Sequence, residues 1–191
     1  MKLYIGTSGY SYKEWKGHFY PQDLPEKEFL KFYGTKLNAV EINNTFYRLP
    51  KESVVQAWAE QVPDDFAFSV KASQRITHIK RLREVGDETE YLMRVVRSLK
   101  HRLGVVLFQL PPNMKKDIER LQQFLTLFAG DVRVAIEFRH PSWFDEETYK
   151  LLQESNCSLC VADWDEKLEV PFVSTADWGY LRLRRESYTP A

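Results

Sequence analysis

The chain has 191 residues, of which 43% are hydrophobic and 14% aromatic, so it can bury a sizeable core as one domain spanning residues 1–191. Its 27 Lys and Arg residues balance its 27 Asp and Glu residues, which argues against a protein held to nucleic acid or membrane by bulk charge. No apolar run approaches the length of a membrane span, and the chain begins directly with a strand-like pattern. We therefore expect a soluble, cytoplasmic protein.

Short apolar runs alternate with helical patterns along the chain. The predicted strands cover residues 3–8, 39–43, 66–71, 105–110, 132–139, 158–163 and 179–184. The predicted helices cover about residues 26–33, 53–61 with Ser53 as the cap, 88–103, 117–128 and 145–154. Helices inserted between successive strands imply parallel strands with right-handed crossovers, and hence an α/β fold.

The two cysteines, Cys157 and Cys160, are three residues apart in an apolar run that is typical of a strand. Residues with this spacing on a strand point to opposite faces, so the pattern favours neither a disulfide nor a shared metal. We expect reduced thiols in the core.

Most of the predicted strands have one apolar face and one face that becomes polar near the strand end. The apolar face carries Val40, Ile42, Phe68, Val70, Ile136, Phe138, Leu181 and Leu183, and the polar face carries Glu41, Asn43, Ser69, Lys71, Glu137, Arg139, Arg182 and Arg184. A flat sheet covered by helices on both faces would be apolar on both. Polar groups collected on one face favour a TIM-type (β/α) barrel, in which late strand positions surround a cavity.

Several sequence blocks resemble, in order, those of the domain-of-unknown-function 72 (YecE-like) family. They are Gly6-Thr7-Ser8-Gly9-Tyr10, Trp15 with Phe19-Tyr20-Pro21, Val40-Glu41-Ile42-Asn43 with Thr45-Phe46-Tyr47, Ile76-Thr77-His78, Leu107-Phe108-Gln109-Leu110-Pro111-Pro112, and Glu137-Phe138-Arg139-His140 with Ser142-Trp143. The resemblance implies a TIM-type barrel but no particular activity. Members of that family continue well past the equivalent of Tyr188, so we expect this domain to be C-terminally incomplete, lacking the last strand and helices of an eight-stranded barrel.

The candidate site residues lie at predicted strand ends or in the loops that follow them. The candidate catalytic residues are Glu41, Glu137, Asp163 and His140, and the candidate substrate-binding residues are Tyr10, Asn43, Tyr47, Lys71, Gln109, Arg139, Trp143 and Arg182. Residues that leave parallel strands at the same end converge on one pocket.

The chemistry of this set leaves alternatives open. Glu41 and Glu137 could act as a general acid and base, or could join Asp163 and His140 around a hard divalent metal, although no spaced metal-binding motif is present and the cofactor is unknown. The cations suit a phosphate or a carboxylate. Alternatively, Glu137 pairs with Lys71 or Arg182, and Glu41 with Arg139, in a purely structural network.

Two classes of function follow from these residues. The first is an enzyme, a hydrolase, lyase or isomerase, that acts on an anionic or sugar-like small molecule at the carboxyl ends of the strands. The alternative is a module that binds nucleic acid or another polyanion through basic residues in 71–102 and 182–185. An open barrel edge would also expose Ile5, Leu181 and Leu183, which predicts a homo-oligomer through that edge.

Overall fold

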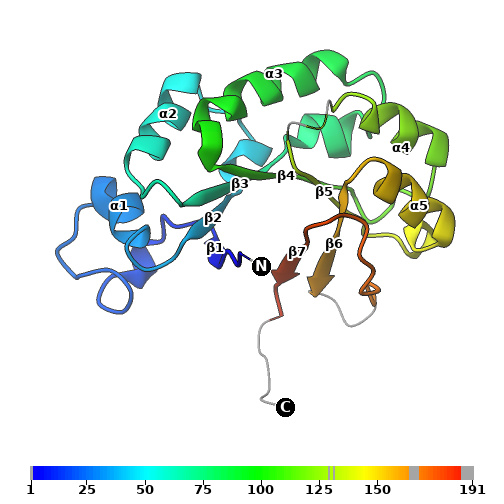
Figure 1. Cartoon of the computed structure of the whole chain (residues 1–191). Helices are drawn as coiled ribbons and strands as arrows, with labels where there is room; N and C mark the ends of the chain where they lie inside the picture. Colours follow the sequence, from blue (N-terminus) through cyan, green and yellow to red (C-terminus); the bar gives the residue numbers. More distant parts are fainter. Residues whose placement is uncertain (1, 129, 131, 164–167, 186–191) are drawn as a thin grey trace. The chain divides into compact units, whose positions relative to one another are not determined.

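The computed structural model describes residues 2–128, 130, 132–163 and 168–185 (Figure 1). The chain is an α/β protein whose described residues form seven strands that are neighbours in chain order, from β1 to β7. The pairs β1–β2, β2–β3, β4–β5, β5–β6 and β6–β7 are parallel. Its internal contacts divide it into two compact units, Met1–Ser73 with Glu90–Val105 and Gln74–Thr89 with Val106–Ala191. Within the described ranges, no helix is long and apolar enough to cross a membrane.

The first unit contains three parallel strands with short helices beside them. The strands are β1 (Gly6–Ser8), β2 (Ala39–Ile42) and β3 (Ala67–Lys71), and the helices are α1 (Phe29–Tyr33), α2 (Glu52–Glu60) and the second half of α3 (Gly86–Val96). Figure 1 shows α1 and α2 on one side of these strands. The apolar side chains Val40 and Phe68 lie in register on β2 and β3 and are buried in the core.

The second unit begins with the π-helix Arg75–Ile79 and contains most of the remaining strands. It holds the later part of β4 (Leu103–Gln109), then α4 (Ile118–Leu125), β5 (Val134–Glu137), α5 (Glu146–Glu154), β6 (Ser158–Asp163) and β7 (Tyr180–Leu183). Figure 1 shows α4 and α5 beside β5 and β6. The buried rings of Phe108 and Phe124 join β4 to α4, with 5.0 Å between their centroids.

The α/β class and the parallel strands predicted from the sequence are confirmed. Each predicted strand is present within two or three residues of its expected bounds, and residues 158–163 match as predicted. Three local predictions are wrong. Ser53 is not a cap, because α2 begins at Glu52 after Lys51; residues 97–102 form 3-10 helix rather than α-helix; and the segment before α3 forms a π-helix rather than a loop.

Cys157 and Cys160 are buried and form no disulfide, as the sequence predicted. Burial raises the pKa of the Cys157 thiol to about 11, so this sulfur is a poor nucleophile near neutral pH.

Candidate functional site

The centre of the second unit's polar cluster is the carboxylate of Glu137, which ends β5 and has 0% of its side chain exposed. Its Oε1 accepts hydrogen bonds from Gln109 Nε2 at 2.7 Å and from Arg139 Nε at 2.9 Å. Its Oε2 accepts from Arg182 Nη1 at 2.5 Å. One strand-end carboxylate therefore holds three of the predicted site residues together.

The strand register explains why these residues meet. Gln109 and Glu137 are paired positions on β4 and β5, so their side chains are neighbours on one face. On β7, Arg182 is buried while Leu181 and Leu183 are exposed, so this strand turns its charged residue inward. The exposure predicted for both leucines is confirmed, and so is that of Ile5 in the first unit.

Two arginines compensate the buried charge of Glu137. A buried carboxylate is costly unless it is paired and hydrogen-bonded, and Glu137 has two guanidinium partners. The side chain of Arg182 is 3% exposed and that of Arg139 is 21% exposed, so part of the Arg139 group is accessible to solvent.

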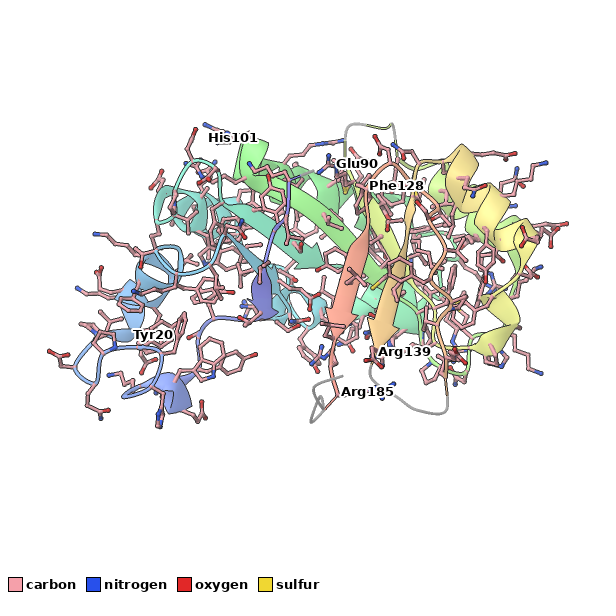
Figure 2. All side chains as sticks on the ribbon, turned by 60° about the horizontal axis from the view of Figure 1, so that its bottom comes forward. Tyr20, Glu90, His101, Phe128, Arg139 and Arg185 are labelled. Atoms are coloured by element: carbon pink, nitrogen blue, oxygen red, sulfur yellow. The ribbon has the colours of Figure 1, made fainter. Side chains whose placement is uncertain are left out.

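A second ion pair lies at the ends of β6 and β7. Arg185 Nε donates to Asp163 Oδ1 at 2.5 Å, and the backbone N–H of Arg184 donates to the Asp163 carbonyl at 2.8 Å. Figure 2 shows Arg139 and Arg185 near the arrowheads of β6 and β7, which are the carboxyl ends of these strands. Within the second unit, the predicted residues of β5, β6 and β7 therefore lie at one end of the sheet.

The loop after β5 gives its two predicted residues different environments. The Nδ1 of His140 lies 2.8 Å from Ser142 Oγ and accepts the Ser142 backbone N–H at 3.2 Å, so the neutral ring carries its proton on Nε2. Trp143 is fully buried; it stacks on Phe138 at 4.6 Å and donates its indole N–H to the Met114 carbonyl at 2.8 Å. These two contacts of Trp143 hold the loop after β5 against Phe138 and the Met114 backbone.

The remaining predicted residues, Tyr10, Glu41, Asn43, Tyr47 and Lys71, belong to the first unit. Glu41 is 7% exposed and its Oε1 accepts from Ser8 Oγ at 2.9 Å. Lys71 Nζ lies 4.3 Å from the centroid of the Phe46 ring.

Ser8, which contacts the candidate residue Glu41, was not predicted from the sequence. It pairs with Glu41 in the register between β1 and β2, at the end of the first strand. The sequence could have indicated this contact, because Ser8 is a polar residue at the end of the first strand and Glu41 lies near the end of the next one.

A separate ionic cluster in the second unit was also missed. Glu88 Oε1 lies 2.8 Å from Arg75 Nε and 2.9 Å from Lys80 Nζ. These two cations lower the pKa of the Glu88 carboxyl from its usual 4.5 to about 2, chiefly through their hydrogen bonds. The partners belong to the π-helix region, which the sequence pattern did not reveal.

Among the described residues, no group of three or more His, Cys, Asp or Glu side chains could hold a metal ion. An open hollow of about 650 Å³ lies in the first unit, but its lining contains none of the predicted site residues. It is lined by Gly17, His18, Phe19, Tyr20, Pro21, Gln22, Phe32 and Lys36.

The fold and the site define a parallel α/β protein with ion pairs at the ends of its strands, such as those of Glu137 and Asp163. The family model described as "Protein of unknown function DUF72" matches residues 4–190, and the chain belongs to this family.

Two bacterial relatives support this assignment. The chain is 35% identical to the UPF0759 protein YecE of Escherichia coli K12 over 144 residues, which are 74% of this chain and 50% of YecE. It is 30% identical to the UPF0759 protein YunF of Bacillus subtilis over 158 residues, which are 78% of this chain and 54% of YunF. The chain thus spans about half the length of these curated relatives.

Two solved structures have a similar fold. A DUF72 family protein of Thermotoga maritima superposes with a TM-score of 0.83 at 32% identity, covering 96% of this chain and 75% of that one. A DUF72 family protein of Enterococcus faecalis superposes with a TM-score of 0.78 at 20% identity, covering 95% of this chain and 70% of that one. The second likeness concerns the fold alone.

Proposed function

We propose that the protein is an enzyme, a hydrolase, lyase or isomerase, that acts on a small anionic molecule. In this proposal Arg139 and Arg182 bind the anionic group of the substrate at the carboxyl ends of β5 and β7. The observation that carries it is the buried Glu137, which holds two guanidinium groups at the strand ends, one of which, Arg139, is partly exposed. Guanidinium groups match phosphate and carboxylate oxygens in geometry and charge.

The proposed role of Glu137 is to position the two arginines. Its carboxylate already accepts three hydrogen bonds, and these fix the direction from which each guanidinium approaches. Positioned charges stabilise a transition state better than mobile ones, since they do not reorganise during the reaction. Because Glu137 has this positioning role, the acid–base groups proposed for this unit are Asp163, the last residue of β6, and His140, which follows the end of β5.

The proposed architecture behind this site is a TIM-type barrel. Parallel strands in chain order, with helices between most of them, support it. In such barrels the catalytic residues come from the carboxyl ends of several strands, which agrees with the positions of Gln109, Glu137 and Arg182 in the second unit.

The alternative function, binding of a polyanion, has less support. Several basic residues predicted to form a basic face are engaged with acids of their own unit. Arg75 and Lys80 bind Glu88, while Arg102 lies 2.9 Å from Asp64. These pairs reduce the net charge available to an extended polyanion.

Calorimetric titration with sulfate tests the proposed anion site. The wild-type chain should bind sulfate, and Arg139→Met should weaken binding about tenfold or more, because it removes the guanidinium that faces solvent. Lys150→Met is the matched control, since the Lys150 side chain is 77% exposed and lies 4.0 Å from Glu154 on the surface of α5. Equal affinity in wild type and Arg139→Met would overturn the proposal.

A further inference from the structure

A second polar surface lies in the first unit, at the ends of β1, β2 and β3. The register pairs Ser8 with Glu41 and Glu41 with Ser69, so these three side chains form one row across the strands. Ser8 Oγ donates to Glu41 Oε1 at 2.9 Å, and both Glu41 and Ser69 are buried. The row combines one carboxylate with two hydroxyl groups.

A second row, Asn43 and Lys71, follows the first. Lys71 lies on the same face of β3 as Ser69, because residues two apart on a strand point the same way. Asn43 directly follows β2, and its helical backbone leads into the 3-10 helix Asn44–Phe46. Both residues are partly exposed, whereas Glu41 and Ser69 are buried. Together the rows carry one carboxylate and one ammonium.

An aromatic loop borders these rows. Thr45 Oγ1 donates to the Lys71 carbonyl at 2.7 Å, which ties the loop after β2 to the end of β3. The Phe46 ring lies 4.3 Å from Lys71 Nζ and packs edge-on against Tyr47, with 5.1 Å between their centroids. Tyr47 is 75% exposed and presents a large aromatic ring beside the polar rows.

The end of β1 is held in place by hydrogen bonds to Tyr33. The Tyr33 hydroxyl accepts the Thr7 backbone N–H at 2.8 Å and donates to the Ala39 carbonyl at 2.9 Å. These bonds join β1 to β2 one residue before Ser8. The distance between Ser8 and Glu41 is therefore fixed by the fold, as a preorganised binding site requires.

We propose that this surface binds a neutral polyhydroxylated ligand, a sugar or polyol. A carboxylate accepts up to about four hydrogen bonds, so Glu41 can accept from two neighbouring hydroxyl groups while it keeps its bond from Ser8. The Asn43 amide and the Lys71 ammonium donate to hydroxyl oxygens, and the Tyr47 ring packs against the C–H face of the ligand. Convergent polar groups beside an aromatic wall are typical of small-molecule sites.

This inference goes beyond the anion site and does not depend on it. The residues belong to the first unit, they include one carboxylate and one ammonium, and the ligand class is neutral. A ligand of this class competes with water, since its hydroxyl groups replace water molecules one for one. We therefore expect weak affinity for a free monosaccharide, with a Kd on the order of 1 mM.

Saturation-transfer NMR on the whole chain tests this inference with three probes, myo-inositol, D-ribose and D-glucose. At least one probe should show transfer from the wild-type protein. Glu41→Gln should weaken binding about tenfold or more, because the neutral amide accepts weaker hydrogen bonds than a carboxylate. Glu60→Gln is the control, since Glu60 is exposed at the end of α2.

Tyr47→Ala provides a second variant that leaves the core intact, because Tyr47 is largely exposed. It should also weaken probe binding several-fold while the circular dichroism spectrum stays unchanged. The inference is overturned if no probe binds the wild type, or if folded Glu41→Gln and Tyr47→Ala proteins bind as the wild type does. Sulfate titration separates the two sites, since Glu41→Gln should keep sulfate binding and Arg139→Met should keep probe binding.

Discussion

At the scale of single residues, the ion pairs of Glu137 with Arg139 and Arg182 contribute to the stability of the fold. Removing one partner of a buried ion pair leaves an uncompensated charge, and this costs more than the pair contributes. Glu137→Gln leaves the buried Arg182 guanidinium beside a neutral amide. We predict that this substitution lowers the free energy of unfolding by about 3–5 kcal/mol, measured by urea denaturation.

The control for this experiment is Glu154→Gln. Glu154 lies 4.0 Å from Lys150 on the exposed surface of α5, and surface pairs of this kind contribute only about 0–1 kcal/mol. A loss below about 1 kcal/mol for Glu137→Gln would contradict the claim that Glu137 compensates both arginines.

Glu88 predicts how stability depends on pH. Its pKa is about 2 in the folded protein and 4.5 in the unfolded chain, so the stabilisation is fully present above pH 4.5 and is lost as the pH falls toward 2. The wild type should therefore lose unfolding free energy over this window, and Glu88→Gln should lose less. Urea denaturation at several pH values between 2 and 6 measures the difference. Glu90→Gln, an exposed neighbour on α3, should behave as the wild type does.

At the scale of elements, two helix starts offer a matched comparison. The Asp145 side chain accepts the Thr148 backbone N–H at 3.0 Å and caps α5, whereas α2 begins without a side-chain cap. Asp145→Ala should cost about 1 kcal/mol of unfolding free energy, and Ser53→Ala less than about 0.5 kcal/mol. Equal losses in thermal or urea denaturation would mean that the cap at Asp145 contributes nothing.

Two glycines test the close approach of β1 and β2. A Cβ added at Gly6 would lie 1.9 Å from the Ala39 carbonyl oxygen, whereas one added at Gly86 would have no heavy atom within 4 Å. Gly6→Ala should therefore destabilise the protein by about 1–3 kcal/mol, because backbone must move to admit it. Gly86→Ala should be nearly neutral in the same assay, and a similar loss in both variants would contradict the pairing of these strands.

Sequence periodicity predicted the elements well because most strands are short, buried runs between helices with clear polar faces. The strand at residues 158–163 could be predicted with its bounds, because Asn156 precedes this mainly apolar run and acidic residues follow it. The π-helix Arg75–Ile79 could not, because no composition distinguishes it from a basic loop. The end of the α-helix at Val96 could not be predicted either. Lys100, which has a φ of 55°, is an ordinary helix former that continues the helical pattern of the sequence.

The sequence indicated which polar residues lie at the strand ends, but not which of them contact one another. Alternation along the strands placed Gln109, Glu137 and Arg182 correctly at strand ends, since residue parity fixes the face. Which cation pairs with Glu137 depends on side-chain reach across strands, and the sequence left Lys71 and Arg182 as alternatives. In the structure Glu137 pairs with Arg182 and also with Arg139.

At the scale of the whole molecule, the central proposal is that the protein binds an anion at the ends of the strands in the second unit. A crystal structure of the chain grown with selenate tests this most directly, because selenium gives an anomalous signal that identifies the anion. The account predicts an anomalous peak within hydrogen-bonding distance of the Arg139 guanidinium, and no such peak in Arg139→Met. Selenate found only on exposed surface lysines, with none at Arg139, would contradict it.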